Sequence, residues 1–442
     1  MEKLAILGGE KAVKTDVEDI FTWPIITDED RNAVLDVLND RSMSDTGVTK
    51  KFEDEFASWI GKKYALGFNN GTSALQAAMH AVGIGKGDEL ICQSNTYWAS
   101  CLPCFSLRAT VVFADIERNT LCIDPKDIEH RISEDTKAIM AVHYNGYPTP
   151  MDEILKIAEK YDLKVIEDVS HAHGALYKGK PVGTFGDVSA MSMMSGKAFA
   201  VGEAGMLVTD NREIYQKAIA FGHYDRNSDK YIDVDDLIPY MGLPSGGYKY
   251  RMHQMSAAVG RVQLKHYDQR CKEIQDAMNY FWDLLEDVPG IKAHRPAKGS
   301  NSTMGGWYNP KGLYYAEELG GLNINVYTKA LNAEGIKTSP GGNIPLHTHR
   351  LFQDCDVYHD GKPTRIAYAN RDVRLLDKSI YVGEKINSLT IKIPWFKRFR
   401  KEIIEEHAEA FRKVGAQYEE LLKNEEADSA VKGSWNSFEI RG

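Results

Sequence analysis

Between residues 60 and 265, short apolar runs rich in β-branched residues alternate with longer stretches of helical periodicity. The runs that predict strands cover residues 63–68, 89–93, 109–116, 136–144 and 163–168. In one helical stretch, Met151, Ile154, Leu155 and Ala158 fall on a single face. Strands joined by helices of this length favour an α/β fold with a mainly parallel sheet that is covered on both faces. Ligands of such folds bind beside the carboxyl ends of the strands.

The rest of the chain follows other patterns. A long helical pattern covers residues 253–286, Gly- and Pro-punctuated segments follow it, and a last helical pattern covers 401–423. Near the start, Thr27 and Asp30 form a capping pattern that predicts a helix over residues 28–39. Because 442 residues are too many for one small core, we predict four parts: an N-terminal arm (1–30), a large domain (31–265), a smaller α+β C-terminal domain (266–423) and a polar tail (424–442).

Composition narrows the classes of partner. Lys and Arg number 54 against 63 Asp and Glu, which gives a formal charge of −9, and an acidic chain disfavours nucleic acid as a partner. No stretch approaches the roughly 20 apolar residues of a membrane span, and the first residues lack the apolar core of an export signal. We therefore expect a cytoplasmic protein without a membrane partner.

The six cysteines are sparse in a chain of this length, so we expect reduced thiols. Cys101 and Cys104 form a CxxC, but no second CxxC and no pair of His residues lies nearby to complete a metal site. We expect no bound metal, and for this pair either buried thiols or a redox couple.

The segment NNGTSALQ, residues 69–76, places Gly71, Thr72 and Ser73 between a strand and a helix. The first amides of a helix lack intrahelical partners, and the helix dipole favours an anion beside them. Glycine lets the backbone approach such an anion closely, and the two hydroxyls can add hydrogen bonds. The segment therefore predicts a phosphate cradle, with an ordinary Ser or Thr helix cap as the alternative.

Asp168 ends the predicted strand 163–168, within the segment IEDVSHAHGA. A carboxylate at that position is costly unless it has a partner. The partner is either the protonated ring nitrogen of a bound cofactor or a set of neighbouring backbone amides. His171 and His173 follow, either as polar core residues or as cofactor contacts.

Lys197 lies in the run Ser195-Gly196-Lys197-Ala198, which precedes a Gly-Glu-Ala-Gly turn. A lysine amine becomes nucleophilic when burial or a nearby cation lowers its pKa. The flanking Met, Ala and Phe residues indicate such an apolar setting, and an ordinary surface lysine is the alternative.

The cradle, the strand-end acid and the lysine occur in the order that fold-type I enzymes of pyridoxal phosphate (PLP) use. Over about residues 44–265, and more weakly to about 415, the chain resembles the DegT/DnrJ/EryC1/StrS family of PLP-dependent sugar aminotransferases. The matching runs include NTYWAS, IEDVSHAHGALYKGKPVGTFGDVSAMS, the Lys197 segment with GEAG, and GYKYRMHQMSAAVGRVQL. The resemblance implies a fold-type I architecture, in which a mainly parallel seven-stranded sheet lies between helices beside a smaller C-terminal domain.

The resemblance also implies roles for single residues. It implies that Lys197 forms a Schiff base with pyridoxal 5'-phosphate and that Asp168 holds the protonated pyridine nitrogen, so that these two carry catalysis. His171 would stand near the phenolic oxygen of the cofactor. Tyr97 would stack on the pyridine ring, with Trp98 as the alternative.

For the phosphate of the cofactor, the resemblance implies contacts from Gly71, Thr72 and Ser192, with Ser73 nearby. The family commonly has Asn in a GYNYRM motif, and that Asn reaches the phosphate of the neighbouring subunit. This chain has Lys249 there, which either binds phosphate as a point charge or reads a substrate oxygen. Fold-type I enzymes usually build each site from two subunits, so the resemblance implies a homodimer or a larger assembly, and we leave the cross-subunit contact open.

The activity that the resemblance implies is ping-pong transfer of an amino group from glutamate or glutamine to a cyclic ketone, with pyridoxamine 5'-phosphate as the intermediate. The acceptor is a nucleotide-linked keto-sugar or a keto-cyclitol such as scyllo-inosose. The opening LAILGGEKAV with Trp23-Pro24 resembles the branch that acts on scyllo-inosose. Candidate substrate contacts, each with a structural role as the alternative, are His223, Arg251, His347 and His349.

Three other functions share parts of this pattern. A related sugar dehydratase uses PLP or pyridoxamine phosphate with His in place of the Schiff-base lysine, and Lys197 argues against it. A PLP-binding or sugar-sensing regulatory protein would keep the same site without turnover. An α/β enzyme without a cofactor is the third.

Overall fold

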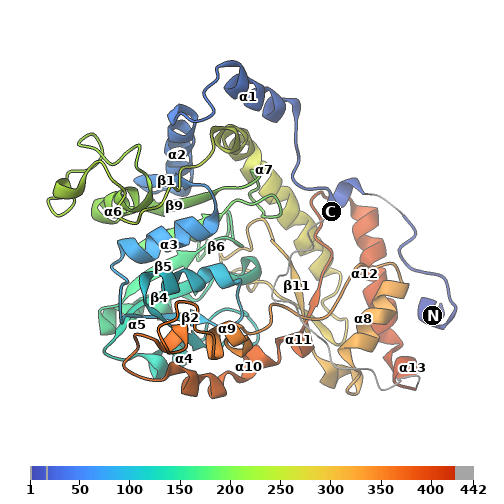
Figure 1. Cartoon of the computed structure of the whole chain (residues 1–442). Coiled ribbons are helices and arrows are strands. Elements are labelled where there is room, and N and C mark those ends of the chain that lie inside the picture. Colours follow the sequence, from blue (N-terminus) through green and yellow to red (C-terminus); the bar gives the residue numbers. More distant parts are fainter. Residues whose placement is uncertain (1, 16–17, 424–442) are drawn as a thin grey trace.

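The computed structural model describes residues 2–15 and 18–423, and the predicted polar tail over residues 424–442 lies outside them. A seven-stranded sheet forms the centre of the larger part of the molecule (Figure 1). Within it β9 runs antiparallel to both neighbours and the other pairs are parallel, so the expected mainly parallel sheet is confirmed. In spatial order the strands are β1 (Tyr64–Phe68), β9 (Gly205–Thr209), β8 (Val188–Ser192), β5 (Lys164–Asp168), β4 (Thr136–Val142), β2 (Glu89–Gln93) and β3 (Thr110–Ala114).

Each strand that the apolar runs predict is present, and β2 has the predicted bounds. The strands are buried on both faces, which is why they read as continuous apolar runs. Along β2, the side chains of Leu90 and Cys92 pack on one face and that of Ile91 packs on the other. The first face is covered by α3 (Gly71–Ala81) and α6 (Arg212–Gly222), and the second by α4 (Pro125–Arg131) and α5 (Met151–Tyr161).

Three further helices complete the large part of the molecule. Helices α2 (Gly47–Ile60) and α7 (Gln254–Asp283) pack against the β1 and β9 end of the sheet. Helix α1 (Asp28–Asn39) lies on α7 (Figure 1). It begins with the predicted capping box, in which the Thr27 amide donates to the Asp30 carboxylate at 2.8 Å.

A smaller sheet follows α7, with β10 (Ile291–Ala293), β11 (Lys311–Tyr314) and β12 (Thr390–Lys392) in antiparallel order. It packs with the second half of α7, with α8 (Ile324–Ala333) and with α12 (Lys401–Ala416). The prediction of one helix over residues 401–423 is wrong. Gln417 leaves the helical conformation, at φ −117° and ψ 25°, and a separate helix α13 (Tyr418–Lys423) follows it.

The chain returns to the large sheet after the small one has begun. Leu346, Phe352, Ile380 and Ile386 join the core that α3 and α6 share with the large sheet. Past β3, the Asp115 carboxylate accepts the backbone amides of three residues, Tyr381, Val382 and Gly383, at 2.8, 2.9 and 2.7 Å. Packing thus interleaves the two parts, and the division at residue 265 stays a prediction.

The N-terminal arm packs on the smaller part. Its apolar residues Leu4, Val13 and Ile20 are buried in the core of that part. Glu334, which follows α8, accepts the backbone amides of Ala5 and Ala12 at 2.7 and 2.9 Å. The same carboxylate pairs with Lys413 of α12 at 2.9 Å, and both side chains are buried.

Membrane spans and disulfides can be checked over the described residues. None of their helices combines the length and the apolar character that a membrane span requires. Their six cysteines are all free, and Cys101 and Cys104 are buried thiols.

Glu334→Ala should lower the free energy of unfolding by about 3–5 kcal/mol, because it leaves the buried Lys413 ammonium unpaired. Glu406→Ala is the matched control, since Glu406 also accepts two amides of the arm but does so at the surface. Its loss should be about 1 kcal/mol. Urea unfolding of both variants measures the difference, and equal losses would contradict the role of Glu334.

Candidate active site

Asp168 lies at the carboxyl end of β5, and its side chain is buried. Its Oδ2 atom accepts a hydrogen bond from the Ser100 hydroxyl at 2.7 Å, and its Oδ1 atom accepts one from the Ser170 amide at 3.0 Å. The Ser170 hydroxyl in turn accepts the Ser192 amide at 2.9 Å. Hydrogen bonds therefore hold the carboxylate in place and link it to Ser192 at the end of β8.

Lys197 lies in the loop between β8 and β9, and its side chain is only 3% exposed. Its backbone amide donates to the Met194 carbonyl at 2.8 Å, and its own carbonyl accepts the indole N–H of Trp23 at 2.8 Å. Burial lowers the pKa of the Lys197 amine to about 7, although the nearby Asp168 acts in the opposite direction. The amine is therefore largely deprotonated above neutral pH, the state that a nucleophile requires.

Tyr308 covers this amine, and no sequence pattern marks it. The Lys197 Nζ atom lies 4.4 Å from the centre of the Tyr308 ring. That ring contacts His171 at 4.7 Å and meets Trp395 edge-on at 5.8 Å, measured between ring centres. Tyr308 precedes β11, so the smaller part of the molecule closes the lysine site, a contact that no local spacing predicts.

His171 lies beside Tyr308 and is buried. Burial, followed by the nearby Lys197, holds the pKa of His171 well below its usual value, so the ring is neutral. Its Nδ1 atom accepts the Asn145 amide at 3.3 Å, which leaves the proton on Nε2 and a donor for a ligand oxygen. Asn145 itself has φ 52°, a left-handed conformation that Asn tolerates better than most residues.

Tyr97 and Trp98 reach the site through the same short turn. The turn is η3 (Trp98–Ser100), and its last residue donates to Asp168. Both aromatic side chains are partly buried, and their ring centres lie 4.9 Å apart. Either ring can serve as the stacking partner, and Tyr97 stays the predicted one.

The N-terminus of α3 lies directly against the end of β8. A Cβ atom on Gly71 would come within 2.6 Å of the Ser192 Cα atom, so only glycine permits this approach. Asn70 caps the helix, because its side chain accepts the Ser73 amide at 2.8 Å. The Gly71 and Thr72 amides then remain as first-turn donors for an anion.

These groups fit PLP, which needs a deprotonated amine, an acid for its ring nitrogen and an anion cradle. Lys197 lies near both Asp168 and His171, because Asp168 acts to raise the pKa of Lys197 and Lys197 acts to lower the pKa of His171. Ser192 joins the Asp168 network to the Gly71 cradle. The structure thus brings together all the predicted cofactor residues except Lys249, and their contacts with the cofactor stay predictions.

The other predicted residues lie apart from this group. Lys249 is exposed, 5.2 Å from the centre of the Tyr224 ring, and Arg251 lies 4.9 Å from the same ring. They belong to segment 224–251, which follows α6 and projects from the molecule (Figure 1).

Each of the three predicted histidines has a hydrogen-bond partner within the protein. His223 is buried, with Nε2 2.9 Å from the Gly67 carbonyl. His347 lies between Ser94 at 2.6 Å and Glu384 at 3.1 Å. The Nδ1 atom of His349 accepts the Leu351 amide at 3.0 Å. Their roles toward substrate stay predictions.

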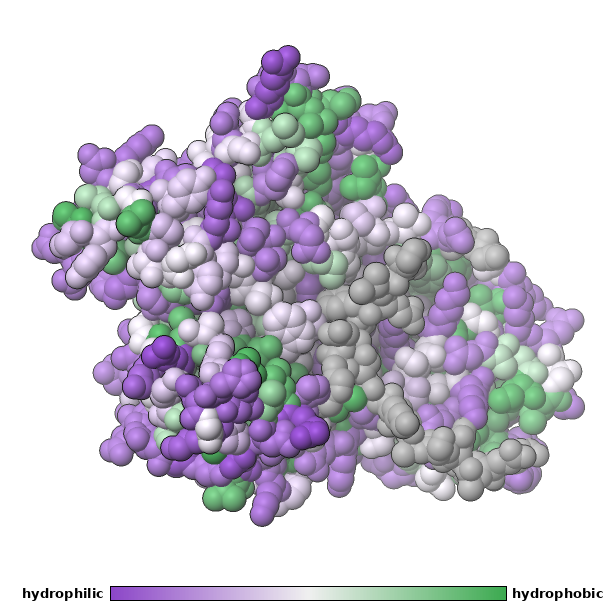
Figure 2. All heavy atoms as spheres, in the orientation of Figure 1, coloured by the Kyte–Doolittle hydropathy of each residue, from purple (hydrophilic) through white to green (hydrophobic). Residues whose placement is uncertain are grey.

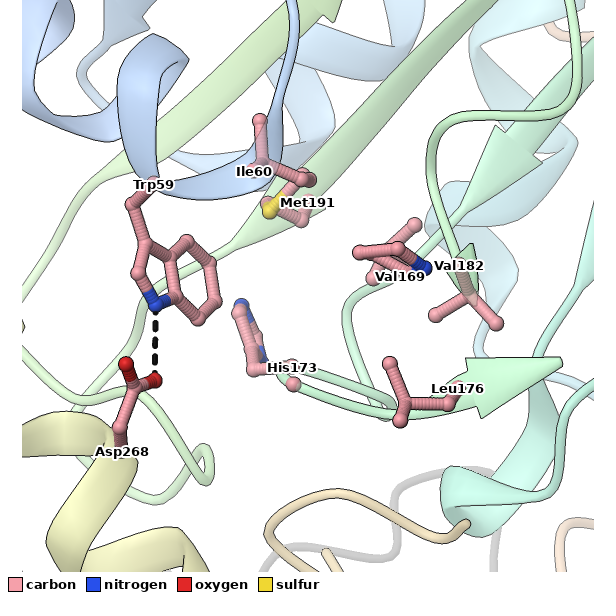
Figure 3. A pocket seen from close by; sticks show the side chains of 10 residues that line it. Trp59, Ile60, Val169, His173, Leu176, Val182, Met191 and Asp268 are labelled. Carbon is pink, nitrogen blue, oxygen red and sulfur yellow. Dashed lines mark hydrogen bonds between the residues drawn. The ribbon is translucent and has the colours of Figure 1, made fainter. Parts of the chain in front are cut away.

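His173 is buried and lines a cavity next to the site. The cavity has a volume of about 210 Å³, and Trp59 of α2, Val169 and Met191 also line it (Figure 3). Burial lowers its pKa to about 3, and its ring stacks on Phe199. These contacts agree with a polar core residue, and a role toward the cofactor stays a prediction.

Comparison with known proteins yields one family. A sequence model described as the DegT/DnrJ/EryC1/StrS aminotransferase family matches residues 24–375. GDP-perosamine synthase of Escherichia coli O157:H7 is 37% identical over 369 residues, which cover 82% of this chain and 96% of that protein. The putative L-glutamine:3-amino-2,3-dideoxy-scyllo-inosose aminotransferase of Micromonospora echinospora is 32% identical over 360 residues, which cover 79% of this chain and 82% of that protein. The X-ray structure of the aminotransferase from Psychrobacter cryohalolentis matches with a TM-score of 0.77 at 26% identity. The match covers 90% of this chain and 99% of that chain.

Lys197→Met should stabilise the cofactor-free protein at pH 6 and have a smaller effect as the pH rises. The folded state binds the Lys197 proton with a pKa of about 7 against an ordinary 10.5, so burial of this lysine lowers stability in full below pH 7 and less toward pH 10.5. Thermal unfolding of both proteins between pH 6 and pH 10 tests this. A difference that does not change with pH would contradict it.

Gly71→Ala should weaken PLP binding by about 10–100-fold, since overpacking of this kind costs about 1–3 kcal/mol. Gly47→Ala is the control, because Gly47 is also the first residue of a helix and a Cβ atom there meets no atom within 4 Å. Fluorescence titration with PLP measures both affinities. If both variants bind PLP as the wild type does, the cradle is assigned to the wrong place.

Proposed function

The chain belongs to the DegT/DnrJ/EryC1/StrS aminotransferase family, and on that premise we propose that it moves an amino group from glutamate or glutamine to a cyclic ketone. The acceptor is a keto-cyclitol such as scyllo-inosose or a nucleotide-linked keto-sugar. As a family member the chain is a PLP-dependent sugar aminotransferase. The observation that carries the proposal is the buried Lys197 amine beside Asp168, with a pKa of about 7.

Each residue of the site has a part in the proposed reaction. PLP, when bound, supplies an electron sink for the bond that breaks at the amino-bearing carbon. Asp168 would hold the proton on the ring nitrogen, and His171 would donate from Nε2 to the phenolic oxygen. The Lys197 amine would take the proton from the substrate carbon and return it on the cofactor side, work that contributes about 10²–10⁴-fold. Tyr308 would exclude water from the amine.

The two half-reactions would share this one site in ping-pong order. Glutamate or glutamine leaves its amino group in the first, and the ketone collects it in the second. The name of the Micromonospora relative, an L-glutamine and inosose aminotransferase, supports glutamine and a cyclitol. The name GDP-perosamine synthase supports a nucleotide-linked sugar instead.

The alternatives differ in what Lys197 does. A dehydratase of this fold would have His at that position, and this chain has Lys. A sugar-sensing protein would bind PLP without turnover, so an assay of the first half-reaction separates it from an enzyme. We retain the cytoplasm as the compartment, supported by six free cysteines.

We extend the proposal to a homodimer in which Lys249 serves the partner's site. Apolar side chains are exposed on the projecting segment and on α1, where Figure 2 shows them in green. Tyr240 and Leu243 are 69% and 77% exposed, and Leu35 of α1 is 50% exposed. Such patches suit an interface between subunits.

The amino donor can be identified in a single half-reaction. PLP-loaded enzyme mixed with either glutamate or glutamine should lose its visible absorbance and release the matching keto acid, and Lys197→Ala should show neither change. A subsequent addition of scyllo-inosose or a nucleotide-linked keto-sugar should restore the absorbance for the true acceptor. Unchanged absorbance with every amino donor would favour the sensor.

A mixing experiment tests the cross-subunit role of Lys249. Lys197→Ala and Lys249→Ala should each be weakly active or inactive alone, and their mixture should regain activity because one hybrid site holds both lysines. A mixture of Lys197→Ala with Asp168→Ala is the control, since both residues belong to one subunit's site and every hybrid site lacks one. Equal results for the two mixtures would contradict the assignment.

A further inference from the structure

Trp23 of the N-terminal arm contacts the catalytic lysine. Its indole N–H donates to the Lys197 carbonyl at 2.8 Å, across 174 residues of sequence. We propose that Trp23 is a positioning residue for Lys197, an inference that rests on the proposed function. Through the Trp23 bond, docking of the arm determines the position of the lysine amine in the site.

The Lys197 backbone is held at both of its polar groups. Its amide donates to Met194 within the loop, and its carbonyl receives the Trp23 bond. A buried carbonyl needs such a partner. The side chain is attached to the Cα atom between these two groups. Fixing the backbone there therefore limits the positions that the amine can reach.

A series of aromatic contacts also connects Trp23 with the amine end of the lysine. Its ring centre lies 6.3 Å from that of Trp395, which lies 5.8 Å from Tyr308. Tyr308 covers the Nζ atom at 4.4 Å. Trp395 is itself fixed, since its N–H donates to the Gly306 carbonyl at 3.0 Å.

The arm is docked on each side of Trp23. Before it, the Ile20 carbonyl accepts the Lys397 amide of the smaller part at 2.8 Å. After it, the Ile25 carbonyl accepts the Gln263 side chain of α7 at 3.2 Å. The arm thus contacts both parts of the molecule, and Trp23 lies between these two contacts, bonded to Lys197.

Trp23→Phe tests the proposal, because it keeps an aromatic ring against Trp395 and removes the N–H. The turnover number of the donor half-reaction should fall about tenfold or more, since a small misplacement can cost about 10²-fold, while KM changes little. Trp59→Phe is the control: it removes an indole bond of equal length, 2.8 Å to Asp268, at the cavity of Figure 3.

A second readout needs neither cofactor nor activity. In cofactor-free protein, the pH midpoint for acylation of Lys197, followed by peptide mass spectrometry, should lie near 7 in the wild type. It should rise by a pH unit or more in Trp23→Phe, because a loosened loop admits water, and stay unchanged in Trp59→Phe. This readout stands even if the enzyme uses no donor in the proposed class, so it separates failure of the inference from failure of the proposed function.

A folded Trp23→Phe with unchanged turnover and midpoint would overturn the inference. If that variant does not fold, 3-benzothienylalanine at position 23 replaces it, since sulfur removes the N–H and preserves the ring shape. The same rise of the midpoint then supports the inference, and an unchanged midpoint refutes it.

Discussion

The buried amine of Lys197 is the constraint on which the rest of the site depends. A charged ammonium in apolar surroundings is unfavourable, so burial brings the pKa of this amine to about 7. The same burial that lowers stability therefore provides a nucleophile at neutral pH. Asp168 and Tyr308 lie near that amine, and Trp23 bonds to the backbone carbonyl of the same lysine, so three separate regions of the chain meet at Lys197.

The predicted phosphate cradle lies where neighbouring parallel strands end at the same edge of the sheet. β5 and β8 finish at the same edge, so Asp168 and Ser192 become neighbours, and one hydrogen-bonded serine, Ser170, joins them. Gly71 then allows the N-terminus of α3 to close on Ser192. The helix dipole and the strand-end acid come together at the position where α/β folds bind ligands.

Sequence patterns could predict the parts of this site that are local. The strands were predictable because both faces are buried. The local segments marked Asp168 and Lys197 only as candidates, each with an ordinary alternative, and their roles came from the resemblance to a family. Tyr308 and Trp23 were not predictable, since each reaches Lys197 only through tertiary contacts between distant segments. Asn70 illustrates a local limit: Asn, Ser and Thr all cap helices well, and only the backbone decides which of several neighbours does so.

The most direct test is to ask which lysine carries the cofactor. Lys311 is the internal competitor, because burial lowers its pKa to about 7 as well, yet its amine donates to the Gly341 carbonyl at 2.8 Å. Protein loaded with PLP would be reduced with borohydride, digested and mapped by mass spectrometry. We predict a pyridoxyl group on Lys197 and none on Lys311. A label on Lys311, or no labelled lysine, would contradict the assignment of the site.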